Sequence, residues 1–201
     1  MTKATHLFAA VVIPCFLAGC VVTPHRATAP SSPTTIAFGA CCHQDRPQPI
    51  WDAVVSAEPE LFIFAGDNIY GDTQDMAVLQ AKYGKLAAVP GYQRLLETCP
   101  VLGVYDDHDY GQNDGGREYP MRAESATICL DFFGVPDDDP RRVHEGVYGS
   151  TLIGDPGQRV QIILLDTRYF RDRLDRGTLT AEERAAEHVV GWYTPTDDTT
   201  R

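Results

Sequence analysis

The stretch that decides the fold reads Leu61-Phe62-Ile63-Phe64-Ala65-Gly66-Asp67-Asn68-Ile69-Tyr70. An apolar run long enough for one β-strand ends at a glycine, and a carboxylate, a carboxamide and a phenol follow within the next four residues. α/β proteins bind their ligands just beyond the carboxyl ends of such strands. Carboxylate and tyrosinate oxygens are hard, anionic ligands that suit a multivalent cation. The stretch therefore predicts a metal site at a strand end, and hence a metal-dependent enzyme.

The rest of the chain alternates predicted strands with predicted helices. Apolar runs predict strands over residues 35–38, 61–65, 101–105 and 160–165, with a further strand over 147–153. Helical spacing predicts helices over residues 50–58, 74–88, 93–98, 121–133 and 180–190, with a break at Pro90-Gly91. The strands at 61–65 and 160–165 are apolar on both faces, as in a buried parallel sheet. The alternation predicts an α/β fold in layers.

Potential ligands and proton carriers directly follow four of these strands. The four clusters read Gly39-Ala40-Cys41-Cys42-His43, Gly66-Asp67-Asn68-Ile69-Tyr70-Gly71-Asp72, Asp106-Asp107-His108-Asp109-Tyr110-Gly111 and Asp166-Thr167-Arg168-Tyr169. Because the carboxyl ends of the strands in an α/β sheet line one crevice, we expect the four clusters to converge there. One such cluster is a weak signal, but four in the same position are hard to explain by chance.

In the second cluster, Asp67 and Tyr70 are the predicted metal ligands, and Asn68 is a candidate supporting residue. Gly66 and Gly71 bracket the turn and let the backbone approach another group closely. The alternative interpretation is structural, with Asp67 capping a turn and Tyr70 serving as a half-buried aromatic residue.

The third cluster places three carboxylates around one imidazole. Adjacent like charges repel, and desolvation raises the cost, so a fold keeps such a cluster when a cation neutralises it or the site uses its protons. Asp107 is the predicted ligand, and His108 is the predicted acid or phosphate-binding group. Asp106 and Asp109 are candidate supporting residues. A solvated acidic loop is the alternative, and the aromatic Tyr105 directly before the cluster argues against it.

The first and last clusters add a thiol and a guanidinium group. A thiolate is a soft ligand that favours iron, zinc or copper, so Cys41 beside the second cluster favours ferric iron. Cys42 and His43 are alternative ligands, and a cysteine acting as a small hydrophobe is the structural alternative. Arg168 is predicted to clamp a phosphate oxygen or to fix a ligand carboxylate, with a structural salt bridge as the alternative. Asp166 is a candidate supporting residue.

The N-terminal segment has the pattern of an export signal. Residues 1–19 combine Lys3 with an apolar stretch that is too short to span a membrane and suits a signal peptide. Leu17-Ala18-Gly19-Cys20 resembles a bacterial lipobox, which predicts cleavage before Cys20 and lipidation of its thiol. The alternative is an ordinary cleaved signal peptide. Residues 20–34 are rich in proline, serine and threonine and predict a flexible tether. We therefore expect an exported, membrane-anchored lipoprotein at the periplasmic face or in the outer membrane.

The charge balance narrows the class of partner. The 201 residues hold 17 Lys and Arg against 28 Asp and Glu, a formal net charge of −11. This balance argues against electrostatic capture of nucleic acid or of an anionic membrane surface. It does not argue against a small phosphate ester, because a bound multivalent cation reverses the local field.

With these residues in view, the chain resembles the alkaline phosphatase D (PhoD-like) branch of the calcineurin-like metallophosphatases. The resemblance rests on Phe38-Gly39-Ala40-Cys41, Gly66–Asp72, Asp106–Gly111 and Leu165-Asp166-Thr167-Arg168, and it covers residues 35–201. It implies part of a four-layer αββα sandwich that hydrolyses phosphate monoesters or diesters with a metal-activated water. It implies Fe3+ held by Cys41, Asp67 and Tyr70, with Asp67 bridging to a second ion, Ca2+, held by Asp107. It implies that His108 faces the substrate phosphate or leaving group.

One departure from the family pattern sets the competing expectation. The family continues into a second half with further histidine ligands, and this chain contains no Gly-x-His-x-His segment. We therefore expect residues 35–201 to form the N-terminal portion of such a domain. The alternative function is a non-catalytic lipoprotein or metal-binding module that lacks the C-terminal half-site.

Overall fold

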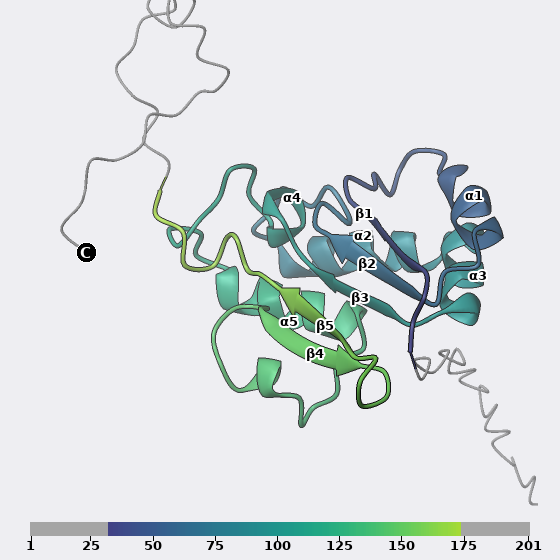
Figure 1. The fold of residues 1–201 in the computed structure, drawn as a ribbon. Helices are drawn as coiled ribbons and strands as arrows, with labels where there is room; N and C mark the ends of the chain where they lie inside the picture. The colour runs from purple at the N-terminus through teal and green to yellow at the C-terminus, as the bar shows by residue number, and fades with distance from the viewer. Residues whose placement is uncertain (1–31, 174–201) are drawn as a thin grey trace, which may run out of the picture.

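The stretch at residues 61–70 supplies the central strand of a three-stranded parallel sheet. Strands β1 (Ile36–Gly39), β2 (Leu61–Ala65) and β3 (Val101–Val104) pair in the order β1-β2-β3. The computed structural model describes residues 32–173, and Figure 1 shows their arrangement. Because all three strands run in the same direction, their carboxyl ends and the turns that follow them lie at one edge of the sheet.

Helices cover one face of this sheet. They are α1 (Ile50–Ser56), α2 (Met76–Ala87), α3 (Pro90–Thr98) and α5 (Arg122–Phe132), while α4 (Asp107–Tyr110) is a single turn after β3. Phe62 and Phe64 of β2 are buried against this layer, where Trp51 lies edge-on to Phe62 at 5.7 Å and Tyr92 edge-on to Phe64 at 5.8 Å between ring centroids. This aromatic cluster holds β2 against the helices and thereby fixes the position of the turn that follows β2 at residues 66–72.

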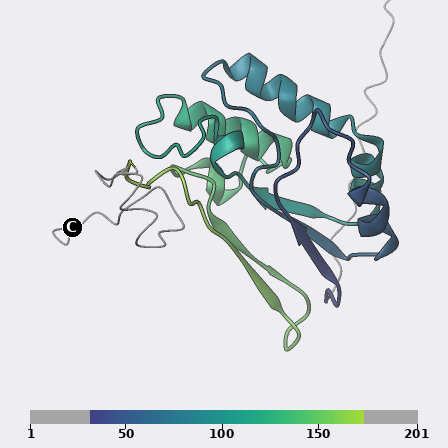
Figure 2. The same cartoon turned by 90° about the horizontal axis from the view of Figure 1, so that it is seen from above.

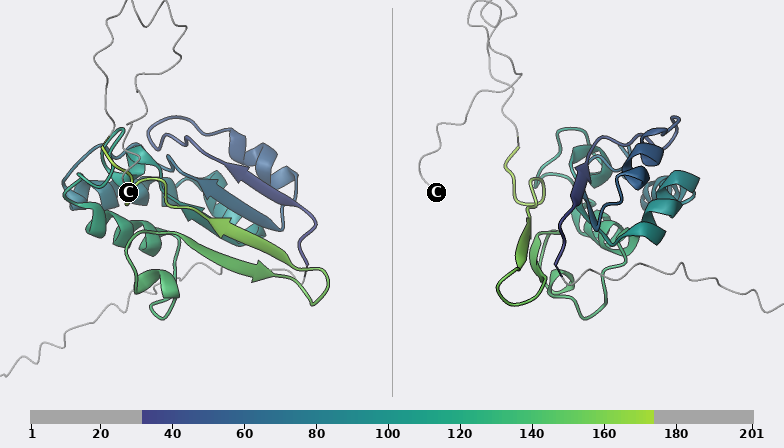
Figure 3. Two further views of the ribbon diagram at one scale, coloured as in Figure 1. Left: turned by 60° about the vertical axis from the view of Figure 1, so that its left-hand side comes forward. Right: turned by 45° about the vertical axis from the view of Figure 1, so that its right-hand side comes forward.

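A β-hairpin lies on the other face of the sheet. Strands β4 (Gly149–Ile153) and β5 (Val160–Leu164) pair antiparallel, after the short helix η1 (Pro140–Arg142). Figures 2 and 3 show three layers in the order helices, parallel sheet and hairpin. The predicted α/β layering is therefore confirmed.

The prediction of a doubly buried parallel strand at 160–165 is wrong. Gly154 and Gly157 adopt positive φ angles of 109° and 94° and turn the chain back on itself, so β5 pairs with β4 in a hairpin. Leu164 faces the core, but Ile163 is 63% exposed and Leu165 is 66% exposed. An apolar run alone did not distinguish these arrangements.

The other predicted elements are present with shifted ends. The break between the helices falls at Ala88-Val89, and Pro90 opens α3, because proline is tolerated in the first turn of a helix. Asp75 begins α2 by accepting hydrogen bonds from the backbone N–H groups of Ala77 and Val78. The predicted helix at 180–190, the signal segment 1–19 and most of the tether 20–34 lie outside the described residues. Within residues 32–173, no helix is long and apolar enough to cross a bilayer.

Candidate metal centre

Backbone hydrogen bonds join the turns that follow β1, β2 and β3. Cys41 N–H donates to Gly66 O at 3.2 Å, and Cys42 N–H donates to Asp67 O at 2.8 Å. Gly71 N–H donates to the backbone oxygen of His108 at 3.0 Å. The first three predicted clusters therefore meet in one place, as the shared edge of the sheet requires.

Two carboxylates and an imidazole form the centre of this place. Asp67, Asp107 and His108 each offer one ligand atom, and these atoms lie within 4.8 Å of one another. The His108 backbone N–H lies 3.0 Å from Asp107 Oδ1 and 3.4 Å from Asp67 Oδ1. Asp67 and Asp107 are largely buried. Such a group of donors is able to hold a cation.

The other oxygen of Asp67 faces the thiol of Cys41, which lies beside the phenol of Tyr70. Cys41 Sγ–H donates to Asp67 Oδ2 at 3.5 Å. Burial, with Cys41 and Asp67 nearby, raises the pKa of Tyr70 to about 12. Burial and the hydrogen bond to Asp67 likewise raise the pKa of Cys41. Asp67 therefore stands between two groups of donors, Cys41 with Tyr70 and Asp107 with His108.

The electrostatics of the two carboxylates differ. Burial and the nearby Asp107 raise the pKa of Asp67. Burial also acts to raise the pKa of Asp107, but the backbone N–H of Asp114 and the guanidinium of Arg168 outweigh it, and the pKa falls. The Asp114 N–H lies 2.7 Å from Asp107 Oδ2. The chain thus stabilises the charge on Asp107 but leaves the charge on Asp67 without full compensation, which a cation would supply.

A third carboxylate orients His108. The Nδ1 atom lies 2.8 Å and 2.9 Å from the two oxygens of Asp72, and the ring packs against Tyr70 with centroids 4.3 Å apart. Burial alone would lower the pKa of His108, but Asp72 outweighs it and raises the pKa. The other neighbour of Tyr70 is His43, stacked at 4.8 Å, so His43 supports the phenol ring here. Asp72 belongs to the second cluster of the sequence but was not among the predicted site residues.

The fourth cluster reaches the site through its arginine. Arg168 Nε forms an ion pair with Asp106, and Nη2 lies 4.0 Å from Asp107 Oδ2. Thr167 Oγ1 donates to Asp106 Oδ1 at 3.2 Å. The guanidinium of Arg168 therefore pairs with Asp106 and lies near the predicted ligand Asp107, and its predicted roles as a phosphate clamp, a support for a ligand carboxylate or a structural salt bridge stay predictions. Asp166 instead accepts hydrogen bonds from Tyr105 OH at 2.6 Å and from three backbone N–H groups, and so ties the end of β5 to β3.

Two predicted supporting residues point into the core. Asn68 and Asp109 are fully buried, and the Asn68 side-chain amide donates to Val104 O at 2.8 Å and to Asp109 Oδ2 at 2.5 Å. Lys82, which was not a predicted site residue, donates from Nζ to the backbone oxygens of Tyr70 at 3.0 Å and of Gly71 at 2.7 Å. These contacts hold the backbone of the β2 turn rather than its ligand atoms.

The backbone of the site occupies the sparsely populated left-handed region at three side-chain-bearing positions. Cys41, Asp67 and Asp72 have φ angles of 59°, 51° and 44°. Such positions cost energy and persist where the surrounding structure determines them, commonly at functional sites. All three side chains contribute to the cluster described above.

The fold is similar to that of PhoD. A solved structure entitled "Structure of PhoD" superposes with a TM-score of 0.54 and 16% sequence identity. The superposition covers 74% of this chain and 34% of that chain, so the present chain spans about a third of the length of PhoD. No protein-family model and no curated protein matches the sequence. The similarity supports a PhoD-like fold.

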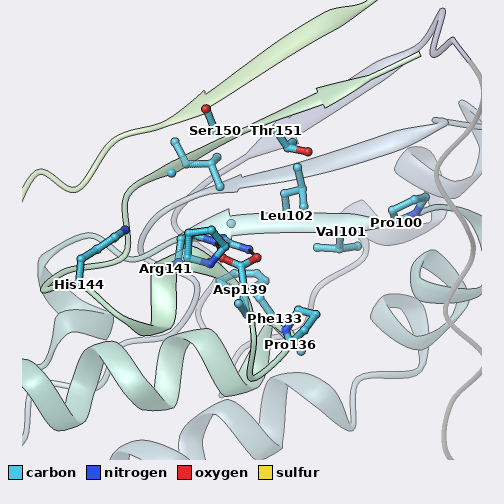
Figure 4. A pocket seen from close by; sticks show the side chains of 16 residues that line it. Pro100, Val101, Leu102, Phe133, Pro136, Asp139, Arg141, His144, Ser150 and Thr151 are labelled. Atoms are coloured by element: carbon cyan, nitrogen blue, oxygen red, sulfur yellow. Dashed lines mark hydrogen bonds and ion pairs between the residues drawn. The ribbon is translucent and has the colours of Figure 1, made fainter. Parts of the chain in front are cut away.

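Two cavities flank the hairpin and the site. One of about 390 Å3 lies between β3, Phe133 and β4, with Arg141, Ser150 and Thr151 at its wall (Figure 4). It contains none of the predicted site residues. The other, of about 740 Å3, opens directly beside Cys41 and Tyr70 and continues along Phe38 and Trp51. Cys41 and Tyr70 are the predicted metal ligands in its lining, so a ligand at these two residues has room for an apolar group beside it.

The four described cysteines are free. Cys99 and Cys129 are buried in the core, and Cys41 and Cys42 lie at the end of β1. Burial raises the pKa of Cys42 to about 11, and burial together with Asp67 also raises the pKa of Cys41, so the pKa does not separate the two thiols. Cys41, with its contact to Asp67, remains the better candidate of the two.

Proposed function

We propose that this chain is a PhoD-like metallophosphatase that hydrolyses phosphate esters. The observation that carries the proposal is the position of Asp67, with one oxygen facing Cys41 and the other facing the Asp107–His108 turn. This arrangement occurs at the strand ends of a PhoD-like fold. A carboxylate placed between two groups of donors suits a bridging ligand in a two-metal site.

The donor set fits the metals that we propose. Cys41 and Tyr70 combine a soft thiolate with a hard phenolate, and together with Asp67 they would hold Fe3+. Asp67 and Asp107 offer oxygen ligands only and would hold a second ion, for which Ca2+ is our candidate. Bound ions would supply an activated water or hydroxide and neutralise charge on the phosphoryl oxygens.

His108 and Arg168 would complete the chemistry in different ways. With its Nδ1 held by Asp72, His108 presents its remaining ring nitrogen as a proton donor for the leaving oxygen or as a contact for the phosphate. Arg168 is engaged with Asp106 and lies near Asp107, so we assign it the task of fixing the carboxylates.

The substrate that we propose is a small phosphate ester with an apolar alcohol portion. The cavity beside Cys41 and Tyr70 has an apolar wall that includes Phe38, Ile50 and Trp51. An aromatic or alkyl group there would be removed from water while the phosphate met the metal ions. The net charge of −11 makes nucleic acid an unsuitable partner.

The location that we propose follows from the N-terminal sequence. Cleavage before Cys20 and lipidation of its thiol would anchor the protein on the exported side of a bacterial membrane. The proline-rich tether would then separate residues 35–201 from the lipid surface.

Removal of metal is expected to abolish hydrolysis. The purified chain should contain iron and should hydrolyse an aryl phosphate, which the apolar cavity suits, better than glycerol phosphate. Treatment with a chelator should reduce the rate to background, and Fe3+ with Ca2+ should restore it. Metal analysis and a chromogenic assay check this expectation. Hydrolysis that persists in the metal-free chain contradicts the proposal, and stoichiometric metal without hydrolysis favours the metal-binding module instead.

Replacement of Asp72 by Ala is expected to slow turnover with little effect on substrate binding. The variant leaves His108 without the carboxylate that fixes its ring, and loss of such an orienting partner costs about 10–100-fold in activity. We expect kcat to fall and KM to stay within about twofold, because the proposed mechanism gives Asp72 no contact with the substrate. Asp131→Ala, which removes an exposed acid paired with Arg142, is the matched control. An equal effect of the two substitutions would remove Asp72 from the proposed site.

A further inference from the structure

Asp109 is a buried carboxylate surrounded by hydrogen-bond donors. Its side chain is fully buried. Oδ1 accepts hydrogen bonds from Asp106 N–H at 2.7 Å and Asp67 N–H at 3.2 Å. Oδ2 accepts from Asn68 N–H at 3.0 Å, from the Asn68 side-chain amide at 2.5 Å and from Tyr83 OH at 3.3 Å. Two oxygens thus serve five donors.

Four of the five donors come from two separate strand ends, and the fifth, Tyr83 OH, comes from α2. Asp67 and Asn68 belong to the turn after β2, and Asp106 lies two residues beyond the end of β3 and is the N-cap residue of α4. The same carboxylate therefore binds both turns. Asp67 and Asp107 are the two acids that would hold metal. Asp109 accepts a hydrogen bond from the backbone N–H of Asp67 itself and from that of Asp106, the residue before Asp107.

Hydrogen bonds from α2 and α5 also hold Asp109 and its neighbour Tyr110 in place. Tyr83 reaches it from α2, and Ser125 of α5 donates from Oγ to Tyr110 O at 2.6 Å and to Asp109 O at 3.4 Å. Ser125 and Tyr110 are fully buried. Because water has no ready access here, a lost carboxylate would leave several donors without a substitute partner, and the turns would have to rearrange.

We propose that Asp109 is a positioning residue that sets the separation of the Asp67 turn and the Asp107 turn, and thereby prepares the chain to bind metal at both. The metal-binding part of this inference rests on the proposed function. Asp109 makes no contact with substrate in this role. It acts through the backbone of the residues that carry the ligands.

The test compares Asp109→Ala with Leu95→Ala. Leu95 is a fully buried core residue of α3 that contacts neither turn through a hydrogen bond, so its truncation supplies a matched loss of stability. Amide hydrogen exchange is measured for peptides that contain residues 66–68 and residue 106. Fe3+ affinity is measured by titration that follows the absorption of the iron–phenolate bond. Asp109→Asn, which keeps one acceptor oxygen, completes the series.

We expect faster exchange in both turns for Asp109→Ala than for Leu95→Ala, and Fe3+ affinity lower by about 10–100-fold. Asp109→Asn should fall between Asp109→Ala and the natural chain in both measurements. Equal exchange in the two turns for Asp109→Ala and Leu95→Ala overturns the inference. If Asp109→Ala does not fold, Asp109→Asn decides by the same comparison. If the natural chain takes up no Fe3+, the proposed function fails, while the exchange data still decide whether Asp109 positions the turns.

Discussion

Asp67→Asn is expected to remove bound metal and hydrolytic activity together while the fold stays intact. Among the described residues, Asp67 is the one whose two oxygens face both groups of proposed ligands. An amide keeps the shape but has no charge and only one acceptor oxygen, so it cannot bridge two cations. We expect metal affinity to fall by about 100-fold or more. Mutation of a residue that only hydrogen-bonds to a metal ligand already lowers metal affinity by up to about 100-fold, and Asp67 is itself a proposed ligand.

Asp67→Asn is also expected to leave the metal-free protein at least as stable as the natural chain. The folded-state pKa of Asp67 is raised by burial and by Asp107, so the charged form costs stability at every pH above that pKa. The neutral amide carries no such cost, and the metal-free Asp67→Asn variant should unfold at an equal or higher urea concentration at pH 7 than the metal-free natural chain. Below the ordinary carboxyl pKa, this gain should disappear.

Asp52→Asn is the matched control for this experiment. Asp52 lies exposed on α1, where it pairs with Arg94, and it does not belong to the group of clustered ligand atoms. Metal content and hydrolysis should be unchanged in this control. Retention of metal by Asp67→Asn, or its loss together with unfolding, would contradict a role for Asp67 as a bridging ligand.

The sequence predicts the parallel sheet well because each strand carries its own signal. The residues of β2 form an apolar run that a glycine ends, and the helices that pack on it show clear spacing. The pairing of β5 was not predictable in this way. Its apolar residues fit either a parallel neighbour or a hairpin, and the choice depends on glycine turns and on contacts distant in sequence.

The sequence likewise predicts part of the candidate site but not all of it. Strand ends that share one edge predict that Cys41, Asp67 and Asp107 come together, and the structure places them so. The strand-end argument does not predict which side chains of α4 point toward this group. Residues two apart in a helix differ in direction by about 200°, so Asp107 faces the cluster while Asp109 faces the core. Sequence adjacency could not separate these two acids.

Gly66→Ala is expected to destabilise the chain by roughly 3–5 kcal/mol. Gly66 has a φ angle of +108°, which residues with a side chain rarely adopt. An added Cβ would lie 2.5 Å from Asp106 Cβ and 2.7 Å from Asp106 N, and backbone atoms cannot move aside as the end of a flexible side chain can. Strain and overpacking therefore add at the same position.

Gly84→Ala provides a control of opposite sign. Gly84 lies inside α2, and an added Cβ there would meet nothing within 4 Å. Replacing a helical glycine by alanine should stabilise the chain by about 0.5–1 kcal/mol. Urea unfolding of both variants at constant m-value measures the difference. Equal midpoints for the two variants would show that the close approach at Gly66 does not constrain the fold.

The damage from Gly66→Ala should also reach the metal centre. The Cβ atom would press on Asp106, whose backbone N–H donates to Asp109, and Asp109 in turn binds the N–H of Asp67. A shift of Asp106 therefore displaces both turns relative to each other. We expect Fe3+ affinity to fall in Gly66→Ala even at temperatures where the variant remains folded, and to stay unchanged in Gly84→Ala. A folded Gly66→Ala variant with unaltered affinity would mean that the spacing of the two turns does not govern metal binding.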